Sequence, residues 1–114
     1  MKRLSSMPLA ALAVLAALPA QGAEPGLQEV RALGVANGRA LACGHQEAAG
    51  RLKAAMLRHA PKTRSYGEAY EEGTRQAFTA VTGGRETCPA PTLVALGAEA
   101  AIQAVQAALP AAKP

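Results

Sequence analysis

Four stretches of the chain repeat apolar residues at the three- and four-residue spacing of an amphipathic helix, and Gly and Pro residues separate them. This spacing predicts helices over residues 25–43, 45–60, 65–82 and 91–109. A strand-like alternation of apolar and polar residues does not occur along the chain. We therefore expect an all-α protein, a small bundle of three to four short helices.

The number of helices depends on Gly44, which lies between the first two stretches. A single Gly costs a helix interior only about 1 kcal/mol, so residues 25–60 form either one bent helix or two helices. Cys43 lies off the apolar stripe of the first stretch, which favours a break near Gly44. On that stripe, Gly34 and Gly38 leave a flat place where another helix can approach closely.

The third helix has the clearest predicted start. Ser65 is expected to be its N-cap, and Glu68 three residues later completes a capping box. The last helix begins near Pro91, which is acceptable in a first helical turn. We expect its buried stripe to consist of Val94, Ala98, Ala101, Ile102, Val105 and Leu109.

The first 23 residues have the order of a secretory signal peptide. Lys2 and Arg3 precede an apolar run over residues 7–18, and small residues follow at positions 20–23. A membrane anchor needs about 18 to 20 continuous apolar residues, and this run is shorter. We therefore expect residues 1–23 to be cleaved, with no stable membrane insertion afterwards.

The remaining chain is long enough for one domain. Residues 24–109 are expected to form a small helical domain, and residues 110–114 a disordered tail. The heavy use of Ala, Arg, Gly and Pro is typical of a bacterial coding bias. The predicted location is therefore the periplasm, or the outside of the cell as a secreted protein.

Cys43 and Cys88 are the only two cysteines. In an oxidising compartment an even pair in a small domain indicates a structural disulfide. The chain has no C-x-x-C motif for thiol exchange and no C-x-x-C-H motif for haem attachment. We expect one disulfide between Cys43 and Cys88 to link the helices of the bundle.

Charge and aromatic content argue against a nucleic-acid partner. The formal net charge of +4 falls to about +2 once Lys2 and Arg3 are removed. A nucleic-acid-binding domain combines a basic stripe with stacking aromatics, whereas this chain has two tyrosines and one phenylalanine. We expect the partner to be a protein of the envelope.

Catalytic motifs are missing from the sequence. The acidic residues are all glutamates, and no G-x-S-x-G elbow, H-E-x-x-H motif or glycine-rich phosphate loop occurs. A domain of this size also has little room for a preorganised cleft. The sequence therefore predicts a protein that is not an enzyme and binds no cofactor.

A metal site is not expected either. His45 and His59 would lie about 21 Å apart along a continuous helix, too far to share an ion. Met56 and His59 are one turn apart, but two ligands leave a site incomplete. The alternative function that these residues leave open is a small-ligand or metal-ion carrier centred on Met56 and His59.

Alanine becomes sparse between residues 56 and 78, where basic and aromatic residues concentrate. Lys62 and Arg64 precede a predicted helix N-terminus, whose free N–H groups attract anions. Tyr66 and Tyr70 are either contact residues or the largest side chains available to the core. We predict a non-catalytic protein–protein interaction or accessory factor of the bacterial envelope. Its candidate interaction residues are His59, Lys62, Arg64, Tyr66, Tyr70 and Arg75.

Overall fold

Four helices form the part of the chain that this computed structural model describes, residues 24–111. They are α1 (Leu27–Ala42), α2 (Gln46–His59), α3 (Arg64–Thr82) and α4 (Pro91–Ala108). No strand occurs within this range, so the predicted all-α fold is confirmed. The predicted signal peptide and the last three residues of the predicted tail lie outside the described residues.

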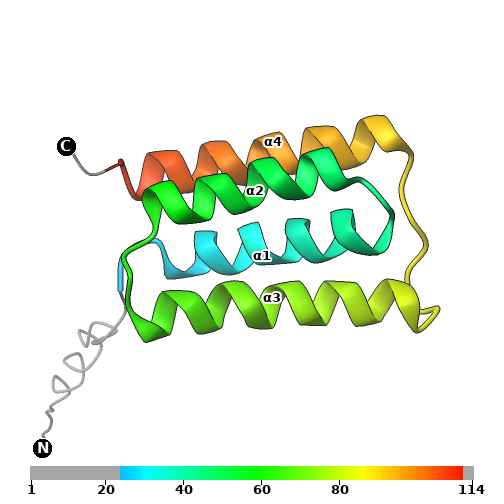
Figure 1. Ribbon diagram of the computed structural model, residues 1–114, viewed down its shortest axis with the longest axis horizontal. Coiled ribbons are helices and arrows are strands. Elements are labelled where there is room, and N and C mark those ends of the chain that lie inside the picture. The colour runs from blue at the N-terminus through cyan, green and yellow to red at the C-terminus, as the bar shows by residue number, and fades with distance from the viewer. Residues whose placement is uncertain (1–23, 112–114) are drawn as a thin grey trace, which may run out of the picture.

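The four helices lie side by side, with α1 in the middle (Figure 1). Helices α2 and α4 cover one side of α1, and α3 covers the other. The contact between α1 and α3 is the most extensive in the bundle, and α2 also packs against α4. None of the described helices is long and apolar enough to span a membrane.

The chain breaks into two helices at Gly44, which settles the alternative that the sequence leaves open. Gly44 has a φ of +79°, a left-handed conformation that ends α1. The N–H of His45 donates to the Ala40 carbonyl at 2.8 Å, and that of Gly44 donates to the Leu41 carbonyl at 3.2 Å. These two bonds form a Schellman motif, so the orphan carbonyls of α1 are satisfied and α2 starts in a new direction.

Two groups of apolar side chains form the core. The larger joins α1, α2 and α4 around Leu33, Leu52 and Val105, all fully buried. The smaller joins the start of α1 to the start of α3 and includes Val30 and Tyr66. Most other buried positions hold alanine. As expected, the buried residues of α4 are Val94, Ala98, Ile102 and Val105, with Ala101 and Leu109 partly buried.

The backbones of α1 and α3 touch through glycine. An ideal Cβ built on Gly34 or Gly38 would lie well under 3.0 Å from a backbone carbonyl oxygen of α3, and one built on Gly73 would meet α1 in the same way. The predicted close approach at Gly34 and Gly38 is therefore confirmed. Beside it, buried Asn37 donates from Nδ2 to Oγ1 of Thr74 at 3.1 Å, a side-chain hydrogen bond that links α1 to α3.

The predicted disulfide between Cys43 and Cys88 is confirmed. It ties the turn after α1 to the irregular segment between α3 and α4, with the two Cα atoms 5.7 Å apart. An ion pair of 2.9 Å between Arg39 and Glu86 joins the same two parts of the chain. The segment that leads into α4 is therefore fixed to the end of α1.

The predicted start of the third helix is wrong in detail. Helix α3 begins at Arg64, its N-cap is Thr63, and no side chain caps it. Ser65 instead donates its hydroxyl to a carboxylate oxygen of Glu24. The capping box fails because Glu24, distant in sequence, offers Ser65 a charged acceptor, and such charge-assisted bonds are stronger than neutral ones.

The α1–α3 contact predicts a steep cost for adding one methyl group. We expect Gly34→Ala and Gly38→Ala each to lower the free energy of unfolding by about 1–3 kcal/mol, because the helices must separate. Gly50→Ala is the matched control: nothing lies within 4 Å of its ideal Cβ, so it should be neutral or stabilise α2 by up to about 1 kcal/mol. Urea denaturation monitored by circular dichroism measures the free energy of unfolding of each variant. Equal values for the three variants would contradict the close α1–α3 contact.

Loss of the disulfide should destabilise the domain strongly. The linked residues are 45 positions apart, so the loop-entropy model gives the bond about 4 kcal/mol, a large share of the stability of a small domain. We expect the double variant Cys43→Ser/Cys88→Ser, which leaves no free thiol, to have a much lower urea midpoint. An unchanged midpoint would mean that packing alone fixes the α3–α4 segment.

Candidate functional site

The loop between α2 and α3 lies at the end of the bundle where both termini of the described chain also lie (Figure 1). The ring atom Nδ1 of His59 is 2.8 Å from the carbonyl oxygen of Leu109, so this side chain holds the C-terminal end in place. Lys62 donates to the Leu57 carbonyl at the end of α2. Arg64 is exposed and 3.9 Å from Glu68. The structure thus brings His59, Lys62 and Arg64 to one end of the bundle.

Tyr66 and Tyr70, in contrast, pack into the core. Tyr66 is 3% exposed, and its hydroxyl donates to the Pro25 carbonyl at 2.7 Å. Burial, and to a smaller extent the nearby Glu24 carboxylate, raise the pKa of Tyr66, and burial also raises the pKa of Tyr70. Tyr70 packs against both parts of the core. Tyr66 is therefore a core residue and does not form part of an exposed surface.

Arg75 is exposed but lies eleven residues beyond Arg64 on α3, about 16 Å along the helix axis. The predicted interaction residues therefore do not form one continuous patch. The N-terminus of α3 also has an acidic side chain from outside the helix beside it, since Ser65 donates to the carboxylate of Glu24 there. A carboxylate near a helix N-terminus already meets the positive end of the helix dipole, so this end offers little to a further anion.

Met56 and His59 do not stand ready as a ligand pair. Met56 is partly buried and packs against both parts of the core. One ring nitrogen of His59 is engaged by Leu109. Among residues 24–111, no group of three or more His, Cys, Asp or Glu side chains is placed to hold a metal ion.

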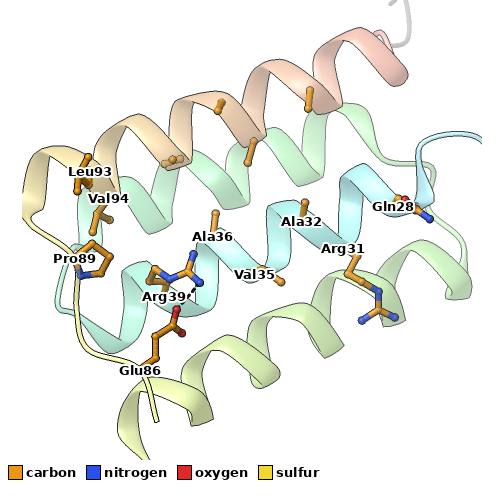
Figure 2. A pocket seen from close by; sticks show the side chains of 15 residues that line it. Gln28, Arg31, Ala32, Val35, Ala36, Arg39, Glu86, Pro89, Leu93 and Val94 are labelled. Atoms are coloured by element: carbon orange, nitrogen blue, oxygen red, sulfur yellow. Dashed lines mark hydrogen bonds and ion pairs between the residues drawn. The ribbon is translucent and has the colours of Figure 1, made fainter. Parts of the chain in front are cut away.

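A groove of about 780 Å³ lies between α1 and α4. Ala32, Val35 and Ala36 of α1 form one wall (Figure 2). The wall contributed by α4 contains Leu93, Val94, Gly97, Ala98, Ala100, Ala101 and Ala104. Both walls are apolar, and most of the side chains are small.

The charged residues at the ends of the groove are already paired. At one end, Arg39 contacts Glu86 at 2.9 Å, as the dashed line in Figure 2 marks. At the other, Arg31 contacts Glu72 at 3.0 Å. The groove is therefore an apolar channel with neutralised ends, which suits an apolar ligand surface better than an ion.

The outer face of α4 continues the groove as an exposed apolar surface. Leu93 and Leu96 are 58% and 65% exposed, and they lie among further exposed apolar residues on the same face of α4. We call this surface the α4 stripe; it consists of Leu93, Leu96, Gly97, Ala100, Ala104 and Ala107, all exposed. At about 100° per residue these six positions span about 100° of the helix circumference.

Charge is kept off this stripe. Glu99 is the only charged residue of α4, and it forms an ion pair with Arg51 of α2. The hydrogen bond from Arg51 lowers the pKa of Glu99. The polar side of α4 thus faces α2, while its second apolar side has no neighbour among the described helices.

Sequence reasoning missed this surface. The signal was present, because α4 is apolar around most of its circumference, and a helix of that kind is normally covered on all sides. One apolar stripe is enough to predict which face enters the core. The second became evident only when the neighbours of α4 were known.

Comparisons with protein families, with curated proteins and with solved structures find no match.

The core position of Tyr66 predicts the effect of removing its hydroxyl. Tyr66→Phe should lower the free energy of unfolding by about 0.5–1.5 kcal/mol, because the Pro25 carbonyl loses its donor. The raised pKa has a second consequence: stability is retained below about pH 10 and falls above it, because the unfolded chain loses its phenol proton first. Urea denaturation at pH 8 and pH 10.5 should show a smaller alkaline loss for the variant. Identical behaviour of the two proteins would mean that Tyr66 is solvated.

Proposed function

We propose that this protein is a non-catalytic, exported interaction protein that binds a helical segment of a protein partner along the α1–α4 groove and the α4 stripe. The observation that carries the proposal is the exposure of Leu93 and Leu96 beside an apolar groove. Contiguous apolar surface of this kind marks interaction sites in soluble proteins.

The shape of the surface favours a helix as the bound element. Helix α4 has 18 residues and is about 27 Å long, so the groove beside it accommodates several turns of a partner helix. Amphipathic helices bind such grooves through apolar residues at positions i, i+3, i+4 and i+7. The small side chains of Gly97, Ala100 and Ala104 allow that helix to approach closely.

Two further observations support the other parts of the proposal. The titratable residues that line the groove, Arg31, Arg39 and Glu86, are all engaged in ion pairs, which argues for binding and not for proton transfer. The disulfide between Cys43 and Cys88 is typical of proteins in oxidising compartments. Together with the predicted signal peptide, it supports export to the periplasm or secretion.

The test is photo-crosslinking in cells that export the protein. A photoreactive residue at Ala100, in the middle of the α4 stripe, should give a discrete protein adduct that mass spectrometry identifies. Leu96→Glu in the same chain should decrease that adduct at least about tenfold, because it puts a charge into an apolar contact. Leu96 is exposed, so the substitution should change the free energy of unfolding by less than about 0.5 kcal/mol.

The loop between α2 and α3 supplies the matched comparison. The same photoreactive residue at Lys62, together with the charge reversal Arg64→Glu, tests the surface that the sequence predicts. Adducts from Ala100 that depend on Leu96 support the groove. Adducts from Lys62 that depend on Arg64, with none from Ala100, would move the binding surface to the loop.

A further inference from the structure

The α4 stripe has a gradient of side-chain size along the helix. The large residues, Leu93 and Leu96, lie near its N-terminal end, and both are more than half exposed. Every later position of the stripe holds a glycine or an alanine. The large residues project from one end of the stripe, and the small residues leave shallow hollows at the other end. Two copies of this surface are complementary when the two helices are antiparallel, because each large residue then lies opposite a hollow.

We infer that the helical partner of this surface is the α4 helix of a second copy of the chain, packed antiparallel about a two-fold axis at Ala100. This inference rests on the proposed function, that the stripe binds a protein helix. About that axis Leu96 faces Ala104 of the second copy, and Leu93 faces Ala107 of the second copy. Each large side chain thus meets a small one, and the same pairs form twice, as an isologous interface requires.

The opposite orientation is less well packed. In a parallel pair Leu93 and Leu96 would meet their own copies and hold the helices apart, while the alanines at the other end would face each other across a gap. Gaps lose dispersion contacts and forced contacts strain side chains, so both would weaken the parallel dimer. At the centre of the antiparallel pair, Ala100 meets its own copy and Gly97 lies beside it, so the two backbones can approach closely.

The absence of charged residues on the α4 stripe favours a second copy of the chain as the bound partner. A two-fold axis brings each residue near its own duplicate, so any charge on the stripe would face a like charge. The stripe has none, and Glu99, the single charge of α4, is turned to Arg51 of its own chain. A partner recognised by its charge would not select so uniformly neutral a face.

The size of the contact sets the expected affinity. A helix face about 27 Å long and about 10 Å wide, with the adjoining edge of α1, is smaller than the roughly 800 Å² per partner of a standard interface. The dimer should therefore be weak and depend on concentration. Sedimentation equilibrium of the mature, disulfide-bonded chain over about three decades of concentration, from about 1 μM to about 1 mM, measures this affinity directly.

The antiparallel register makes a specific prediction for a swap of side chains. Leu96→Ala should weaken the dimer by removing a knob, and Ala104→Leu should weaken it by placing a large group where Leu96 of the second copy packs. The double variant Leu96→Ala/Ala104→Leu should restore dimerisation to within about threefold of the natural chain, because each copy again offers one large and one small residue to the other. Each single variant should raise the dissociation constant at least about tenfold.

The outcomes separate this inference from the proposed function. Weakening by both single variants and rescue by the double variant support the second copy. A chain that stays monomeric at 1 mM, but gives Leu96-dependent adducts with another protein from Ala100, overturns the second copy and leaves the proposed function intact. A monomer without any adduct from Ala100 overturns both. A dimer that the variants do not affect has its interface elsewhere, which also overturns the inference.

Discussion

The direct contact between the backbones of α1 and α3 is the constraint on which the rest of this small fold depends. At Gly34, Gly38 and Gly73 no side chain separates the two backbones, so α3 lies close against α1. Among the described helices α1 then has neighbours on both sides, α3 on one and the pair α2 and α4 on the other. Because half of the buried hydrophobic residues are alanines, close helix spacing is what brings enough atoms into contact to form a core.

The disulfide fixes the irregular segment between α3 and α4 to the α1 end of the bundle. The α3–α4 segment is long compared with the turn at Gly44, and it has few apolar side chains to hold it. Cys88 and Glu86 attach it to Cys43 and Arg39 at the end of α1. The start of α4 is fixed in this way, and with it the position of Leu93 beside the groove.

The arrangement of neighbours also explains why the surface proposed for binding lies on α4. This helix packs one face against α1 and turns its polar side toward α2, where Glu99 meets Arg51. The bundle has no further described helix to cover the remaining face, which is apolar from Leu93 to Ala107. Apolar surface that the fold itself does not bury is available to another helix, and its size gradient favours a second copy of α4.

The sequence by itself determined the features that depend on local spacing and conformation. Apolar periodicity located the four helical stretches, and two cysteines predicted the disulfide. Gly44 left one bent helix or two helices open, and the structure decided for two. Only the tertiary structure decided what depends on groups distant in the chain. Glu24 takes the hydroxyl of Ser65 away from its expected capping role, and Pro25 accepts the buried hydroxyl of Tyr66. The exposure of the α4 stripe is of the same kind, because the number of faces a helix buries is set by its neighbours in space and not by its own residues.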